Sequence, residues 1–209
     1  MLYLALVDIS DVTEESCSFL REELVVHFTE KASLKRKDSI CAKALLCNIL
    51  EEKFNLDGYL IDCDENEKPY LCNSNLHFNL SHSGNFVLCV CGEEKVGCDI
   101  QLLKECNEKI AKRFFSNSEF QLLSKSENKD SDFTRIWTLK ESILKYYGVG
   151  ISGGLDSYDF SGYIKENHFV AYGLNFTVRQ TDEYVVSVCS ETDEIELYSI
   201  NEEIIKKRN

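Results

Sequence analysis

The sequence predicts an α+β fold made of two packed subdomains, each with helices on a small, largely antiparallel sheet. Helix-like and strand-like segments occur in both halves of the chain, and no repeat of about 20 to 50 residues indicates a solenoid. A length of 209 residues suits one domain or two small ones. A single proline and the lack of a Gly/Ser-rich stretch indicate no flexible linker, so we expect subdomains over residues 1–103 and 104–209.

The first half opens with an apolar strand over residues 2–8. Asp11 and Glu14 have the spacing of a capping box ahead of an amphipathic helix, and a second helix is predicted over 33–54. The segment 57–75 is rich in turn formers. Three strands then follow in close order, joined by polar turns: 76–80, 86–91 and 96–101.

The second half is helical at first and then returns to strands. Three helices are predicted, near 106–115, from residue 116 and from about 131 to 147. Gly148 ends the last of them, as glycine commonly does at a helix C-terminus. The strand-like runs that follow include 184–189 and 195–200.

The composition limits the kinds of partner that the protein can bind. The chain has 36 acidic and 23 basic residues, for a formal net charge of −13, which argues against nucleic acid or an anionic membrane as the partner. No apolar run approaches the roughly 20 residues of a membrane helix. Ten cysteines without a C-x-x-C pair, behind a first segment that does not resemble a secretory leader, predict reduced and mostly buried thiols in a cytoplasmic protein.

The strand over 96–101 carries the first candidate site. A period of two places Gly97, Asp99 and Gln101 on one face, with the last two about 6.6 Å apart. Aspartate is uncommon in strands and needs a cation or hydrogen-bond donors when it loses water. A solvated edge strand explains the same pattern equally well.

A second candidate lies on the helix that ends at Tyr147. Glu141 and Lys145 are four residues apart and share one face. They form either an ordinary exposed ion pair or an acid for a metal beside a base for a phosphate. A third candidate is the strand and turn containing Ser81 and His82, whose donors suit a phosphate but not a hydrolase triad.

Together these segments resemble the 4′-phosphopantetheinyl transferases of the surfactin-synthetase-activating class. The likeness extends from Lys68 to Phe160 in the order and spacing of that family. The matching segments are Lys68-Pro69, FNLSHS at 78–83, VGCDIQ at 96–101, IAKRFFSNSEF at 110–120, WTLKESILK at 137–145 and GLDSYDF at 154–160.

The resemblance implies a monomer with two similar halves related by pseudo-twofold symmetry and an active site at their interface. It implies an Mg²⁺-dependent enzyme that transfers the 4′-phosphopantetheine group of coenzyme A to a serine of an apo acyl or peptidyl carrier protein and releases adenosine 3′,5′-bisphosphate. Two other classes stay open: a coenzyme A-binding or regulatory relative with weakened catalysis, and a metal-dependent phosphohydrolase.

The resemblance also implies roles for residues on the metal side. Asp99 and Glu141 would be magnesium ligands, and Lys145 would hold phosphate charge in the catalytic set. Gln101 stands where the family often has glutamate, and it is expected to be a peripheral ligand only. Glu119 would be the base that takes the serine proton, although it also fits a capping box with Ser116.

Other residues are expected to meet the coenzyme and the carrier. Ser81 and His82 would contact the nucleotide-side phosphates, Lys68 the adenosine end and Lys43 the 3′-phosphate, with Lys140 a further candidate for the leaving phosphates. An acidic carrier requires local positive charge on this acidic protein. Three residues share one helix face and are predicted to dock the carrier: Lys109, Lys112 and Arg113.

Overall fold

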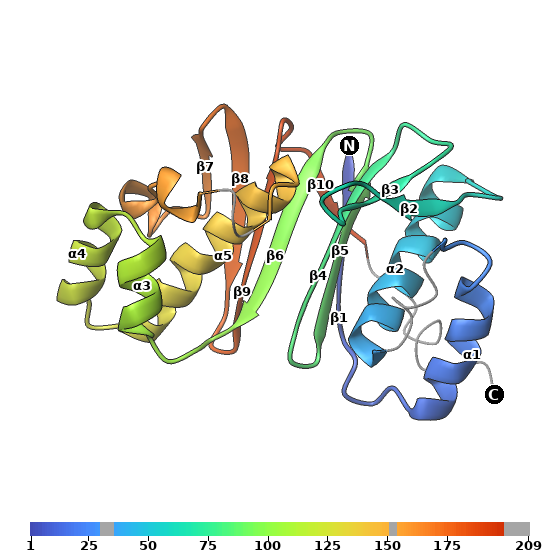
Figure 1. The fold of residues 1–209 in the computed structure, drawn as a ribbon, viewed down its shortest axis with the longest axis horizontal. Coiled ribbons are helices and arrows are strands. Elements are labelled where there is room, and N and C mark those ends of the chain that lie inside the picture. Colours follow the sequence, from blue (N-terminus) through green and yellow to red (C-terminus); the bar gives the residue numbers. More distant parts are fainter. Residues whose placement is uncertain (30–35, 151–153, 199–209) are drawn as a thin grey trace. The chain divides into compact units, whose positions relative to one another are not determined.

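The computed structural model describes residues 1–29, 36–150 and 154–198 (Figure 1). The chain forms two compact units. The first contains Met1–Val96 and the C-terminal segment that starts at Glu194, and the second contains Gly97–Asp193. Each unit has a four-stranded sheet with a long helix packed on it, which confirms the predicted α+β class.

The sheet of the first unit combines strands from both ends of the chain. β1 pairs antiparallel with β5, β5 pairs antiparallel with β4, and β10 lies parallel to β1. A two-residue turn joins β4 to β5, and its Gly84 has a positive φ of 56° that favours glycine. The four strands, in sheet order, are β10 (Ile195–Leu197), β1 (Leu2–Asp8), β5 (Phe86–Gly92) and β4 (His77–Ser83).

Two helices cover this sheet. α2 (Lys37–Phe54) packs on β4 and β5, and α1 (Glu14–Leu24) packs on α2 (Figure 1). Because α2 lies between the sheet and α1, it is buried nearly all round over residues 40–50. The predicted cap at Asp11 was wrong: the hydroxyl of Thr13 accepts the hydrogen bond from the Ser16 amide.

The turn-rich segment between α2 and β4 contains a small hairpin that the sequence did not indicate. β2 (Ile61–Cys63) pairs antiparallel with β3 (Pro69–Leu71). Its turn is held by the carboxylate of Asp64, which accepts hydrogen bonds from the amides of Asn66 and Lys68. Lys68 lies in this hairpin, directly before β3.

The second unit begins with β6 and ends with β9, which are neighbours in its sheet. β7 and β8 form a hairpin, and β8 pairs antiparallel with β9. The predicted run at 184–189 corresponds to β9. The first three residues of the run at 195–200 form β10, which joins the other unit, and residues 199 and 200 lie outside the described part of the chain. The sheet order is β6 (Val96–Leu102), β9 (Tyr184–Ser190), β8 (Leu174–Gln180) and β7 (His168–Ala171).

Three helices connect β6 to β7. α3 (Glu108–Phe114) and α4 (Asn117–Lys125) are short, and α5 (Lys129–Tyr147) packs along β9. α5 ends at Tyr147 and is capped by Gly148, whose φ of 74° is the left-handed value expected at a glycine cap. This helix carries both Glu141 and Lys145.

The division between the units differs from the predicted boundary at residue 103. β6 pairs with β9, and the amide of Leu103 donates to the carbonyl of Glu183 at 2.8 Å, so this strand belongs to the second sheet. The pairing of β10 with β1 returns the end of the chain to the first unit. These are contacts between distant residues, which local sequence patterns do not reveal. The pseudo-twofold relation stays a prediction.

All ten cysteines are thiols outside any disulfide, and most are buried. Burial raises the pKa of the Cys41, Cys47 and Cys91 thiols to about 12, so they are poor nucleophiles. Among the described residues, none of the helices combines the length and the apolar character that crossing a bilayer requires.

Candidate active site

A close approach between β6 and α5 builds the candidate site. A Cβ atom on Gly97 would lie 2.1 Å from the carbonyl oxygen of Ser142 and 2.3 Å from the amide nitrogen of Tyr146. Only glycine allows the strand to come this near to the helix backbone. The helix is also tied to the sheet by a buried hydrogen bond of 2.9 Å between the hydroxyls of Ser142 and Ser187.

Asp99 and Lys145 form an ion pair across this contact. The ammonium of Lys145 lies 2.7 Å from Oδ1 of Asp99, and Asp99 is only 1% exposed. Burial alone would lower the pKa of Lys145, but the charge of Asp99 and the hydrogen bond to it outweigh burial and raise the pKa above its usual value. Lys145 is therefore held in its charged form.

Gln101 and Lys104 continue the network along β6. The amide nitrogen of Gln101 donates to Oδ2 of Asp99 at 3.0 Å, and the ammonium of Lys104 donates to the amide oxygen of Gln101 at 2.5 Å. Lys104 is exposed, whereas Gln101 is half-buried. Lys104 was not among the residues predicted from the sequence. The only signal was a lysine three residues beyond Gln101, just past the end of the strand.

Glu141 joins the same cluster from α5. Burial and the negative charge of Asp99 raise its pKa above the usual value, while Lys145 and Lys104 act in the opposite direction. The structure thus brings together the four residues predicted for the metal side, which come from β6 and α5: Asp99, Gln101, Glu141 and Lys145.

The donor set of this cluster suits magnesium. The described residues contain no group of three or more His, Cys, Asp or Glu side chains that could form a full protein cage. Mg²⁺ is instead usually held by one or two carboxylates together with waters and substrate phosphates. Asp99 and Glu141 supply two carboxylates whose charges act on each other, so the residues present fit this ion.

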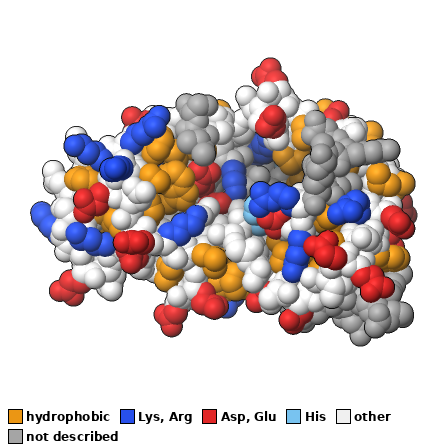
Figure 2. Space-filling view, turned by 60° about the horizontal axis from the view of Figure 1, so that its bottom comes forward, with side chains coloured by type: hydrophobic (Ala, Val, Ile, Leu, Met, Phe, Trp, Pro, Cys, Tyr) orange, Lys and Arg blue, Asp and Glu red, His pale blue; other side chains and the backbone are white. Residues whose placement is uncertain are grey.

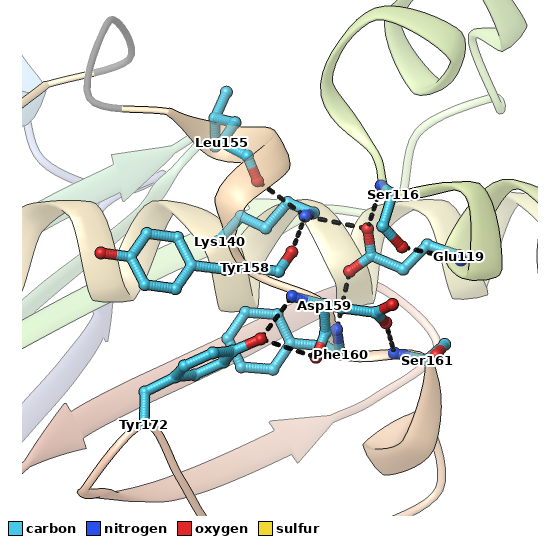
Figure 3. Close-up of polar contacts among 9 residues, drawn as sticks. All are labelled: Ser116, Glu119, Lys140, Leu155, Tyr158, Asp159, Phe160, Ser161 and Tyr172. Carbon is cyan, nitrogen blue, oxygen red and sulfur yellow. Dashed lines mark hydrogen bonds and ion pairs between the residues drawn. The ribbon is translucent and has the colours of Figure 1, made fainter.

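Glu119 and Lys140 form a second ion pair that is fully enclosed (Figure 3). Both side chains are 0% exposed, and Oε2 of Glu119 lies 2.8 Å from the ammonium of Lys140. The same carboxylate accepts from the amide of Ser116 at 2.8 Å, and Oε1 accepts from the amide of Phe160 at 2.8 Å. Both carboxylate oxygens of Glu119 therefore accept hydrogen bonds inside the second unit.

This geometry bears on two expectations from the sequence. The capping box of Ser116 and Glu119 is present in full, which favours the structural reading of Glu119 over the predicted base. Lys140 donates to the backbone carbonyls of Leu155, at 2.7 Å, and Tyr158, so its ammonium is surrounded by protein acceptors (Figure 3). The pair ties the start of α4 and the chain around residues 155–160 to α5.

The predicted coenzyme residues lie in the first unit. Ser81 and His82 are neighbours on β4 and point to opposite sides, Ser81 buried and His82 exposed. Nδ1 of His82 lies 3.3 Å from Oδ2 of Asp38, in the first turn of α2. Burial opposes ionisation of Asp38, but the hydrogen bond from Arg36 and the charge of His82 lower its pKa below the usual value.

Lys43 and Lys68 occupy different surroundings. Lys43 is 7% exposed on α2, with its ammonium 5.0 Å from the centre of the Phe28 ring. Lys68 lies beside a cavity of about 340 Å³, together with Pro69, Tyr70 and Lys95. Both lysines belong to the first unit.

The predicted docking residues lie on α3. Lys109, Lys112 and Arg113 are all exposed, and Arg113 also lies over the ring of Phe114 at 4.9 Å. Figure 2 shows that basic, acidic and hydrophobic side chains are interspersed on the face it displays. Positive charge is therefore available locally in spite of the net charge of −13.

The segment that contains this site is similar to known proteins. Residues 95–193 match the model of the 4′-phosphopantetheinyl transferase superfamily. This range includes β6, α5 and the acidic cluster, by which we mean Asp99, Gln101, Glu141 and Lys145. The resemblance found in the sequence is thus confirmed over this segment, which makes up just under half of the chain.

Several named relatives are similar over 46–64% of the chain. The 4′-phosphopantetheinyl transferase Sfp of Bacillus subtilis is 35% identical over 57% of this chain and 56% of its own length. The transferase psf-1 of Bacillus pumilus is 34% identical over 64% of this chain and 62% of its own length. The transferase HetI of Nostoc is 39% identical over 46% of this chain and 48% of its own length. The chain therefore matches less than two thirds of the length of each of these relatives.

Proposed function

We propose that this protein transfers the 4′-phosphopantetheine group from coenzyme A to a serine of an apo acyl or peptidyl carrier protein. In this reaction the serine hydroxyl gives up its proton to water, and its oxygen bonds to the phosphorus next to the pantetheine arm. The bond from that phosphorus to the oxygen of the nucleotide phosphate breaks, and adenosine 3′,5′-bisphosphate leaves. Relatives that are about 35% identical carry this enzyme name.

One observation carries the proposal: a lysine and two carboxylates meet where β6 touches α5. Lys145 is kept charged beside Asp99, and Glu141 stands one helical turn from Lys145. A diphosphate that is attacked by an oxygen needs its negative charge neutralised, and fixed positive groups do this at little reorganisation cost. Lys145 is the group we assign to the phosphates.

Asp99 and Glu141 would hold a magnesium ion, with Gln101 outside the direct ligands. When bound, the ion supplies charge stabilisation to the diphosphate. Lys145 would orient the same diphosphate from α5 and offset its charge. Glu119 and Lys140 would fix the shape of the helix that carries Glu141, because their contacts are all inside the protein.

The first unit would bind the nucleotide end of the coenzyme. Lys68 lies at a cavity that also contains Tyr70 and Lys95, a mixture of ring and positive charge that suits an adenosine carrying phosphates. We assign Ser81 and His82 to the nucleotide-side phosphates and Lys43 to the 3′-phosphate. The carrier would dock on α3, and the protein would act as a cytoplasmic monomer.

One experiment separates this function from its alternatives. The purified chain is mixed with coenzyme A, Mg²⁺ and a panel of apo carriers, and each carrier is weighed by mass spectrometry. A carrier that gains the mass of phosphopantetheine supports transfer. Breakdown of coenzyme A without carrier modification would indicate a phosphohydrolase, and coenzyme binding without any reaction would indicate a regulatory relative.

A further inference from the structure

A chain of polar contacts crosses the acidic cluster from one lysine to another. Lys145 donates to Oδ1 of Asp99 at 2.7 Å, and Gln101 donates to Oδ2 of Asp99 at 3.0 Å. Lys104 then donates to the amide oxygen of Gln101 at 2.5 Å. Lys104 has no role in the reaction proposed above.

The two ends of the Gln101 amide are fixed by their partners. An amide has one acceptor oxygen, an ammonium can only donate, and a carboxylate can only accept. The oxygen of Gln101 must therefore face Lys104 while its nitrogen faces Asp99. Hydrogen-bond partners assign the direction of an amide in this way.

This direction matters for a cation, because magnesium takes oxygen ligands. An ion held by Asp99 meets the nitrogen side of the Gln101 amide rather than its oxygen. Turning the amide around would break its contacts with both Asp99 and Lys104. Lys104 thus opposes direct ligation by Gln101.

The charges around the site point the same way. Two carboxylates, Asp99 and Glu141, face two ammonium groups, Lys145 and Lys104, so the formal charges of these four side chains cancel. A glutamate in place of Gln101 would leave one negative charge in excess. The positive charge of Lys104 reaches Glu141, where it partly offsets the effects of burial and of Asp99.

We propose that Lys104 is a positioning residue that holds Gln101 out of the coordination shell and thereby weakens the binding of a divalent cation to Asp99 and Glu141. This inference rests on the metal site of the proposed function. It predicts that the loss of the Lys104 ammonium tightens cation binding, because the amide oxygen of Gln101 becomes available as a third ligand.

The test measures the affinity of the intact protein for Mn²⁺ by electron paramagnetic resonance, which needs no turnover. Lys104→Met should tighten Mn²⁺ binding by about threefold. The matched control is Lys125→Met, which removes an exposed lysine at the end of α4 and should leave the affinity unchanged. Unchanged or weaker binding by Lys104→Met overturns the inference.

A second comparison separates positioning from a simple charge effect. If Lys104 acts through the amide, Lys104→Met has little effect in a Gln101→Ala background, where no amide remains to be released. The tightening should also persist at about 1 M salt, where the screening length is about 3 Å. An equal effect with and without Gln101, or its loss in salt, shows that Lys104 acts only as a distant charge and overturns the inference.

The same samples distinguish this failure from failure of the proposed function. If the wild-type protein binds Mn²⁺ but Lys104→Met binds it equally well, only the role of Lys104 is lost. If the wild-type protein binds no Mn²⁺, the inference and the metal site are both overturned. Carrier modification, followed by mass, reports separately on group transfer.

Discussion

The ammonium of Lys140 and the carboxylate of Glu119 lie 2.8 Å apart with neither side chain exposed to solvent. Removal of one partner leaves an uncompensated charge in the interior, at a cost of about 3–5 kcal/mol. We expect Lys140→Met to lower the free energy of unfolding by this amount, measured by urea denaturation. The loss in the double variant Lys140→Met/Glu119→Gln should be smaller than the sum of the single losses, and a near-silent Lys140→Met would contradict this role.

Gly97 should tolerate no side chain. A Cβ there would lie 2.1 Å from the carbonyl oxygen of Ser142, so β6 and α5 would have to separate. We expect Gly97→Ala to destabilise the protein by about 3 kcal/mol, the upper part of the range for overpacking. Gly162→Ala is the matched control, because a Cβ at that glycine meets nothing within 4 Å. Equal unfolding midpoints for the two variants would refute the close approach.

Glu141 should lower the stability of the fold at any pH at which its carboxyl group must ionise. Its pKa is raised by burial and by Asp99, so the native state holds the proton more tightly than the unfolded chain does. In the unfolded chain the pKa of this carboxyl is near 4.5. The contribution of this carboxyl to stability is present below that pH and is lost as the pH rises through the folded pKa.

Glu141→Gln should therefore match the wild-type protein at low pH and be the more stable of the two at about pH 7. Urea midpoints at the two pH values check this, with Glu127→Gln as the control at an exposed glutamate. If the wild-type protein were the more stable of the two at neutral pH, the pKa of Glu141 would be lowered on folding, contrary to this prediction.

The exposed basic face of α3 should affect the carrier and not the coenzyme. Reversing the charges of Lys112 and Arg113 to glutamate removes the attraction for an acidic carrier, so we expect the KM for carrier to rise about tenfold while the KM for coenzyme A stays the same. Lys125→Glu makes a charge reversal on α4 instead and should alter neither constant. A carrier KM that does not change in the α3 variant removes the docking proposal.

The sequence predicted the long periodic elements well, because their signals are local. β1 covers the same residues as the predicted strand 2–8, and the helix predicted to end at Tyr147 ends there. Asp99 and Glu141 could be chosen because a strand aspartate and a helix carboxylate stood in family motifs. Their meeting depends on Gly97, whose contacts with α5 join residues about 45 positions apart in this chain.

Other features depended on partners that lie far away in the sequence. The subdomain boundary was misplaced because β6 pairs with β9 and β10 returns to β1. The role of Glu119 could not be decided from the S-x-x-E pattern alone, since its enclosure also requires Lys140 and the amide of Phe160. Lys104 gave no periodic signal because it lies in a connection just after a strand.

The central claim is that Asp99 and Glu141 act together on one anionic substrate. Its most direct test is the mass of an apo carrier that the wild-type protein modifies, after incubation with Asp99→Ala or Glu141→Ala, coenzyme A and Mg²⁺. Both variants should stay folded by circular dichroism and leave the carrier unmodified, because each removes one of two carboxylates. Either folded variant that modifies the carrier at the wild-type rate would contradict the account.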